Sequence, residues 1–202
     1  MKFFQNKQTG FTPLEGKVKK SSLTGFTLIE LLVVIGIIAI LSSILYANFN
    51  EARMIARDKA RMTSLKEVQL ALELYKAQYG VYPSAGVGTC ANAGDKFVGP
   101  GLGNGDFVGC AGINKSRYID GLVPEFIGAL PMDPTFEDQE NRGYYYRSNG
   151  TSYKFMSYDT VEVNTVSSPG HEFARCPATS GACSGGVPAT TYAVYSAGAE
   201  DW

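Results

Sequence analysis

An apolar run begins at Gly25-Phe26-Thr27-Leu28-Ile29-Glu30 and continues to Ala47, with Glu30 as its only charge. As a helix, its 22 residues from Phe26 onward would extend about 33 Å, and the hydrocarbon core of a bilayer is about 30 Å thick. A carboxylate inside such a run is costly in hydrocarbon unless a partner neutralises it. We therefore predict a transmembrane helix over residues 26–47, in which Glu30 has a functional partner.

The first 25 residues form a basic leader, with five lysines against the single acid Glu15. Positive flanks stay on the cytoplasmic side of a membrane segment, so the bulk of the chain is expected outside. A secretory signal peptide is cut at a small-residue site after its apolar segment. The sequence around Ala47 shows no convincing site of that kind.

The segment from Gly25 to Ile40 resembles the N-terminal motif of the type IV pilins and of the pseudopilins of type II secretion, and the resemblance is firm up to about residue 83. It implies that prepilin peptidase removes residues 1–25 by cutting between Gly25 and Phe26. The same enzyme would then methylate the new amino terminus of Phe26. The apolar helix would remain on the mature protein as a packing surface.

A second Gly-Phe-Thr-x-x-Glu stands at residues 10–15, so cleavage after Gly10 is an alternative. The lysine-rich residues that follow are unsuited to a membrane, and Pro13 argues against a continuous helix there.

The helical pattern continues beyond Ala47, because apolar residues recur at spacings that are sums of three and four. These residues are Ile55, Met62, Leu65, Leu72, Tyr75 and Tyr79. The charged residues between them, among them Arg57, Asp58 and Arg61, are interpreted as a solvated face. No proline occurs between Phe26 and Val81, and Gly80 with Pro83 forms a stop signal. We predict one helix of about 50 residues, amphipathic over residues 48–80.

Residues 81–202 are predicted to form a soluble α+β head. Its first part, residues 84–116, is glycine-rich and is expected to be a loop between helix and sheet. Residues Tyr118–Leu130 are expected to form a short helix. The following Leu130-Pro131-Met132-Asp133-Pro134 resembles the Leu-Pro-x-Asp-Pro of major pseudopilins and many pilins.

A small antiparallel sheet is expected in the second half of the head. Two aromatic runs, at residues 144–148 and 153–158, flank Asn149-Gly150, a strong hairpin signal. Thr160–Val166 is expected to extend the pairing, and Thr191–Tyr195 to form a last short strand. The tyrosines of these runs are interpreted as core and cross-strand packing. The predicted fold class is α+β, with the long helix packed against this sheet.

Four cysteines, Cys90, Cys110, Cys176 and Cys183, all follow the apolar run. An even number of cysteines in an exported domain favours disulfides over metal thiolates. Three connectivities are possible, and we predict the two local pairs, Cys90–Cys110 and Cys176–Cys183.

The sequence offers little for catalysis or nucleic-acid binding. Its single histidine, His171, is not part of an H-E-x-x-H motif, and no Gly-x-Ser-x-Gly elbow occurs. Residues 26–202 hold 13 Lys and Arg against 18 Asp and Glu, a net charge of −5. An acidic exterior does not favour nucleic-acid binding. We expect no enzyme and no nucleic-acid partner.

No cofactor is expected, with calcium as the alternative. The resemblance to major pseudopilins implies a calcium loop near the C-terminus, and residues 195–201 resemble its Ser-x-Gly-Ala-Asp. The ligands would be Ser196, Glu200 and Asp201, but Ala193 stands where an upstream Asp is expected. Calcium takes six to eight oxygen ligands.

The resemblance implies a structural subunit of an extracellular type IV pilus-like filament, made as a single-pass membrane precursor. Its partners would be further copies of itself, prepilin peptidase and an assembly machinery in the membrane. Glu30 would pair with the amine of Phe26 on a neighbouring subunit. The alternatives are a pseudopilin of a type II secretion system and a signal-anchored exported binding module.

Overall fold

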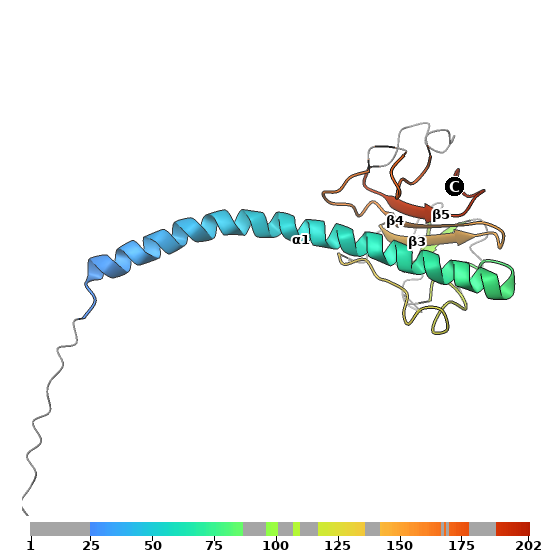
Figure 1. The fold of residues 1–202 in the computed structure, drawn as a ribbon, viewed down its shortest axis with the longest axis horizontal. Coiled ribbons are helices and arrows are strands. Elements are labelled where there is room, and N and C mark those ends of the chain that lie inside the picture. Colours follow the sequence, from blue (N-terminus) through green and yellow to red (C-terminus); the bar gives the residue numbers. More distant parts are fainter. Residues whose placement is uncertain are drawn as a thin grey trace, which may run out of the picture. The chain divides into compact units, whose positions relative to one another are not determined.

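The computed structural model describes residues 25–86, 96–100, 107–109, 117–135, 142–166, 168, 170–177 and 189–202. The chain forms two compact units, Met1–Ile44 and Leu45–Trp202. Helix α1 (Leu28–Tyr79) contributes to both units, and a five-stranded sheet lies in the second (Figure 1). This arrangement confirms the predicted α+β fold class.

Helix α1 has 52 residues, in agreement with the predicted length. It ends where Gly80 adopts a left-handed φ of 79° and donates its N–H to the carbonyl of Lys76 (2.8 Å). This is the bond of an αL cap, which a glycine forms without steric cost. Pro83 follows three residues later, so the chain leaves the helix at the position that the stop signal indicates.

The first part of α1 exposes its apolar side chains. Between Leu28 and Leu41 the large apolar side chains are 49% to 87% exposed. Among the residues that the structure describes, no helix is both long and apolar enough to cross a membrane.

The sheet has the strand order β2-β1-β3-β4-β5. Its strands are β1 (Phe97–Gly99), β2 (Phe107–Gly109), β3 (Gly143–Ser148), β4 (Tyr153–Tyr158) and β5 (Tyr192–Tyr195). Strands β3, β4 and β5 pair antiparallel as predicted, β1 pairs antiparallel to β3, and β2 pairs parallel to β1. Both β1 and β2 lie in the segment that was expected to be a glycine-rich loop. Each is only three residues long, too short to produce a recognisable pattern of alternation.

A hairpin joins β3 to β4 at Asn149-Gly150, as predicted. Ser148 pairs with Tyr153, and the side chain of Asn149 accepts the N–H groups of Thr151 (3.0 Å) and Ser152 (2.8 Å). Gly150 has a φ of 84°, a conformation that favours glycine. The turn residues therefore fix the register of the two longest strands.

The main core lies between the C-terminal half of α1, which contributes Leu65 to Leu72, and one face of the sheet (Figure 1). Alternate strand residues point into it, as the period of a β-strand requires. A second cluster lies on the opposite face and includes Tyr145 and Met156, so both faces are buried, which explains the weak alternation. The tyrosines are core residues, as interpreted. The main core includes Leu65, Val68, Leu72, Tyr144, Tyr146, Tyr153, Phe155, Tyr192 and Val194.

The short helix predicted for residues 118–130 is wrong, since this segment consists of turns. Gly121 adopts a left-handed φ of 71°, and Pro124 follows a cis peptide bond. Proline lacks an N–H and restricts the residue before it, so the helix is interrupted. Tyr118, Leu122 and Leu130 are nevertheless buried in the main core. The apolar spacing thus predicted burial correctly and secondary structure incorrectly.

The strand predicted over residues 160–166 is also absent from this described segment. Thr160 and Val161 both donate their N–H groups to the carbonyl of Thr190, and Val166 donates to that of Ala189. Three amides between them bind a helix side chain instead, as described below. The segment is therefore an anchored loop.

We predict that Gly99→Ala destabilises the head. A Cβ at Gly99 would clash with the carbonyl oxygen of Tyr144 and lie 2.7 Å from the ring of Tyr145. Overpacking of this kind costs about 1–3 kcal/mol. Gly128→Ala is the control, because a Cβ there meets no atom within 4 Å. Urea unfolding of the full-length protein in detergent measures both, and equal stability of the two variants would contradict the prediction.

Candidate assembly site and polar network of the head

A polar cap begins helix α1. The carboxylate of Glu30 accepts hydrogen bonds from the main-chain N–H (2.8 Å) and the hydroxyl (2.7 Å) of Thr27. In return, the Thr27 hydroxyl oxygen accepts the N–H of Glu30 (3.3 Å). This reciprocal arrangement is a capping box, formed by the Thr-x-x-Glu of the predicted motif. The acid also lies at the helix end where the macrodipole favours negative charge.

The predicted cleavage residues precede the cap. Residues 25–27 are outside the helix, and Phe26 is 89% exposed. A Cβ built on Gly25 meets no atom within 4 Å, so the Gly25–Phe26 peptide bond lies in open, non-helical chain. Phe26 and Glu30 border the same shallow apolar hollow, together with Ile29, Val33 and Val34. The roles of these residues in cleavage, methylation and assembly remain predictions.

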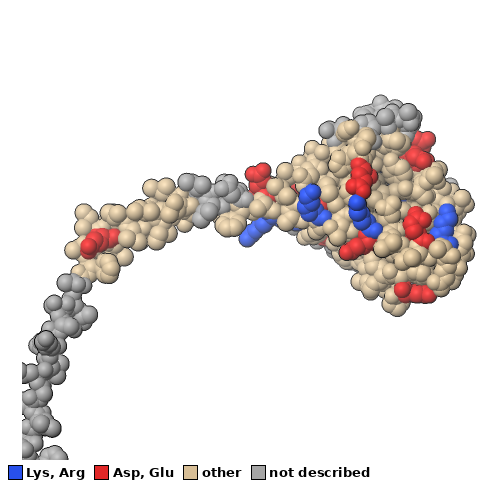
Figure 2. All heavy atoms as spheres, viewed as in Figure 1, with Lys and Arg blue, Asp and Glu red and all other residues tan. Residues whose placement is uncertain are grey.

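Glu30 is the one charged residue in an otherwise apolar stretch. Figure 2 shows the described part of this stretch as uncharged apart from a single acidic patch. The described hydrogen bonds of the Glu30 carboxylate go to its Oε2 atom. Since a carboxylate offers about four acceptor sites, the cap leaves capacity for a cationic partner.

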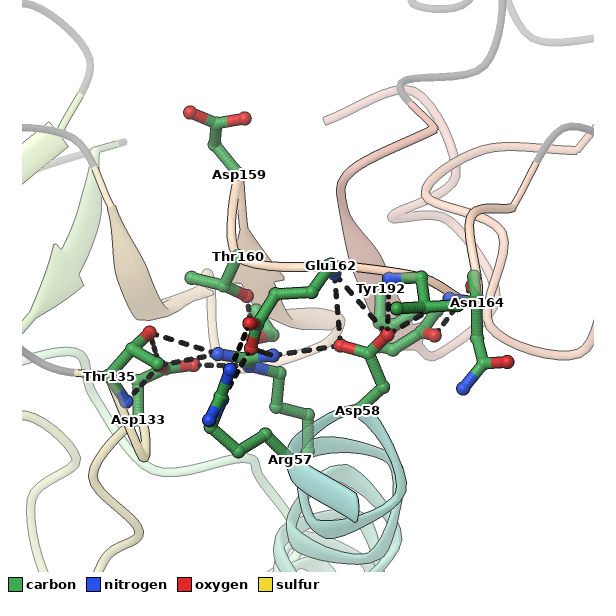
Figure 3. A network of polar contacts seen from close by, with 12 residues as sticks. Arg57, Asp58, Asp133, Thr135, Asp159, Thr160, Glu162, Asn164 and Tyr192 are labelled. Atoms are coloured by element: carbon green, nitrogen blue, oxygen red, sulfur yellow. Dashed lines mark hydrogen bonds and ion pairs between the residues drawn. The ribbon is translucent and has the colours of Figure 1, made fainter. Parts of the chain in front are cut away.

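The head contains a buried polar network centred on Arg61 of α1, whose side chain is fully buried. Figure 3 shows this network, with its residues Asp58, Asp133 and Glu162 labelled. Its guanidinium binds Asp133 with two bonds, from Nε (2.7 Å) and Nη2 (2.9 Å). Its Nη1 atom also donates to Asp58 (2.8 Å) and Glu162 (2.9 Å), and Nη2 donates to Thr135 (3.0 Å). Paired bonds between arginine and a carboxylate are among the strongest hydrogen bonds in proteins.

Asp58 attaches the loop after β4 to the helix. Its buried carboxylate accepts the N–H groups of Glu162 (3.1 Å), Val163 (2.8 Å) and Asn164 (2.9 Å). Buried amides outside regular structure need such acceptors. Asp58 thus replaces the strand partners that this loop lacks.

Asp133 and Glu162 are held in their ionised forms. Burial would raise the pKa of Asp133, but hydrogen bonds from Arg61 and Thr135 outweigh it and lower the pKa below its usual value. The pKa of Glu162 is lowered mainly by its hydrogen bond from Arg57, with burial acting against it. The network therefore contributes most stability where these acids are charged.

The interpretation of Arg57, Asp58 and Arg61 as a solvated face is wrong for the last two, whose side chains are fully buried. Of the network residues, only Asp133 was singled out, through the Leu-Pro-x-Asp-Pro resemblance. A signal was nevertheless present in the spacing. Positions 58, 61, 65, 68 and 72 are separated by threes and fours, so both charges continue the buried stripe of α1.

Two residues of the alternative calcium site make hydrogen bonds within the head, and calcium binding there stays a prediction. The Ser196 hydroxyl accepts the N–H of Tyr153 (2.9 Å), and the Glu200 carboxylate accepts that of Gly198 (2.7 Å). The Lys154 ammonium binds two main-chain carbonyls of the same segment. Nowhere in the described ranges do three or more His, Cys, Asp or Glu residues gather as metal ligands. Calcium takes six to eight oxygen ligands, and Asp201 is exposed.

Cys176 is buried and disulfide-bonded. Cys90, Cys110 and Cys183 lie outside the described residues, so the pairs Cys90–Cys110 and Cys176–Cys183 stay predictions. His171 is exposed in a turn, where its Nδ1 atom accepts the N–H of Phe173 (3.1 Å).

We predict that Arg61→Met strongly destabilises the head. The variant leaves buried carboxylates without their cation, which costs about 3–5 kcal/mol. Lys66→Met is the control, because the Lys66–Glu172 ion pair is exposed and such pairs contribute about 0–1 kcal/mol. Urea unfolding in detergent compares the two. A loss for Arg61→Met no greater than that for Lys66→Met would show that the network does not stabilise the fold.

The lowered pKa values of Asp133 and Glu162 predict a loss of stability in acid. The unfolded chain binds more protons at these groups, so the stabilisation is full above their unfolded pKa values and falls between about pH 5 and pH 3. Glu162→Gln should make this fall shallower, whereas Glu172→Gln, at an exposed site, should not. Melting temperatures across this range provide the measurement. Parallel curves for wild type and Glu162→Gln would contradict the prediction.

Known proteins share the N-terminal motif of this chain, which includes Thr27 and Glu30. Residues 23–46 match the prokaryotic N-terminal methylation motif. The chain is also 29% identical over 154 residues to the type II secretion system core protein G of Vibrio cholerae serotype O1. That alignment covers 76% of this chain and 86% of the relative. No solved structure matches the chain. The methylation motif and this similarity together support the assignment of the chain to the family of type IV pilins and pseudopilins.

Proposed function

We propose that the chain is a structural subunit of an extracellular type IV pilus-like filament, assembled through its N-terminal apolar helix. The observation that carries this proposal is the position of the Thr27–Glu30 cap. It lies at the N-terminal end of an exposed apolar helix surface, within the methylation motif. The motif match and the similarity to a pseudopilin support the role of a pilin-like or pseudopilin subunit. That this subunit forms an extracellular pilus-like filament is what we propose in addition.

The exposed apolar surface needs an apolar environment. Large apolar side chains from Leu28 to Leu41 are at least 49% exposed, which is unfavourable in water over so large an area. In the precursor, lipid would cover residues 26–47, with the leader cytoplasmic and the head outside. In the filament, the same segment of neighbouring subunits would replace the lipid. One surface would thus serve two successive states.

Glu30 would set the register between subunits. Cleavage by prepilin peptidase after Gly25 would create an amine at Phe26, two residues before α1 begins. Pairing of that amine with Glu30 of a neighbour would neutralise two charges that are costly in an apolar setting. The Glu30 carboxylate has acceptor sites for this amine in addition to its bonds from Thr27. Its role would therefore lie in assembly.

A pseudopilin of a type II secretion system is the second candidate, and the similarity to a core protein of such a system favours it. In that case the partner would be the secretion machinery. The alternative of a signal-anchored binding module receives no support from the comparisons.

We predict that Glu30→Ala abolishes filament assembly but leaves the head folded, because it removes the carboxylate that would pair with the neighbouring amine, and the only described bonds of that carboxylate are the cap bonds from Thr27. Electron microscopy and immunoblotting of sheared filaments measure assembly. Ser43→Ala is the control, since Ser43 is another exposed polar residue of the same segment, bonded only to its own helix in the described contacts (Ile40 carbonyl, 2.7 Å). Normal filaments in Glu30→Ala would refute the pairing.

The same strains distinguish the two candidates. Surface filaments that disappear in Glu30→Ala, with protein secretion intact, indicate a pilus. Loss of protein secretion without surface filaments indicates a pseudopilus. Mass spectrometry of the wild-type subunit should give an N-methylated Phe26 as first residue. A start at Met1, after Gly10 or after Ala47 would contradict the proposed processing.

A further inference from the structure

Lys154 of β4 is a lysine with no exposed surface. Its Nζ atom donates to the main-chain carbonyls of Glu200 (3.0 Å) and Trp202 (2.8 Å). It also lies over the ring of Tyr195, 5.0 Å from the centroid. Burying a charge is costly unless it is paired and hydrogen-bonded, so these contacts are the reason that the residue is tolerated.

The charged groups around Lys154 act in both directions. Burial lowers the pKa of Lys154 to about 7, and Arg175 and Arg147 act in the same sense. Asp201 and Glu200 act to raise it. The two acids of the C-terminal segment therefore balance part of the positive charge around Lys154.

The C-terminal segment, Ser196–Trp202, turns back beside β4. Ser196 donates its N–H to the carbonyl of Tyr153 (3.1 Å), and the Ser152 hydroxyl donates to the carbonyl of Ala197 (2.8 Å). These bonds hold the start of the segment. In the described contacts, Lys154 makes the side-chain bonds to its far end.

The far end of this segment covers the second core cluster. The ring of Trp202 packs against that cluster, which includes Phe97 and Tyr145. The guanidinium of Arg147 lies between two rings, 4.5 Å from the centroid of Trp202 and 5.7 Å from that of Phe97. The bond from Lys154 to the Trp202 carbonyl thus places an aromatic cover on the outer face of the sheet.

Two converging carbonyls with acids nearby are ligands that a hard cation such as calcium accepts. We propose that the Lys154 ammonium is a built-in cation that fastens the C-terminal segment to β4, so that this segment folds without a bound divalent ion. The inference concerns the fold of the head and does not depend on the proposed filament.

Trp202 is the only tryptophan of the chain, so its fluorescence reports on this segment. Lys154→Met keeps most of the side-chain volume and removes the donors. At pH 6, in full-length protein in detergent, we expect a red shift of the Trp202 emission and stronger quenching by acrylamide. Lys76→Met is the control, because Lys76 also contacts a carbonyl (Thr151, 3.3 Å) and a ring (Tyr82, 4.2 Å to the centroid), but neither group belongs to the C-terminal segment.

The wild-type protein provides an independent arm, which does not require the variant to fold. Addition of excess EGTA or of millimolar calcium should change neither its Trp202 emission nor its melting temperature. A shift with either reagent would show that a divalent ion fastens the segment and would overturn the proposal. Unchanged Trp202 quenching in a folded Lys154→Met variant would overturn it as well.

Discussion

The head depends on the burial of one guanidinium. Arg61 is buried on a helix face that is mainly apolar apart from Asp58, and carboxylate and hydroxyl oxygens around the guanidinium make this tolerable. Asp133 and Thr135 come from one loop, Glu162 comes from another, and Asp58 comes from the preceding turn of α1. Removing the Asp133 carboxylate would take two hydrogen bonds away from the buried guanidinium. The loops around the sheet are consequently fixed by a helix residue rather than by strand pairing.

Helix α1 meets two different constraints along its length. From Leu28 to Leu41 its apolar residues are distributed around the whole circumference and exposed, so the subunit alone does not satisfy them. From Asp58 onward only one stripe is buried, and the head covers it. The cap at Thr27 and Glu30 begins the first part, and the Gly80 cap ends the second. In the proposed filament, the first part would join subunits while the second would carry a head that is already complete.

Local signals in the sequence predicted α1, the Asn149-Gly150 hairpin and the last strand, since each depends on neighbouring residues. The turns at residues 118–130 differ from the predicted helix because Gly121 and Pro124 interrupt a segment whose apolar spacing favours a helix. Strands β1 and β2 and the anchored loop at residues 160–166 depend on distant partners, which no local pattern reveals. The N-terminal motif alone is enough to identify Glu30 as a candidate assembly residue. The network of Arg61 was overlooked because charged residues on a helix are usually solvated, although their spacing matched the buried stripe.

The two buried cations of the head, Arg61 and Lys154, have a similar structural role. Arg61 and Lys154 lie on regular elements, α1 and β4, and both are satisfied by oxygens of irregular segments. An irregular segment loses much conformational entropy on ordering and has few ladder bonds to offset the loss. A single cation that donates hydrogen bonds to several oxygens can fix such a segment without prescribing its apolar residues. Side-chain oxygens bind Arg61, whereas main-chain carbonyls bind Lys154, so the second contact constrains the sequence of its segment less. The C-terminal segment can therefore vary in sequence while Lys154 still holds it on the sheet.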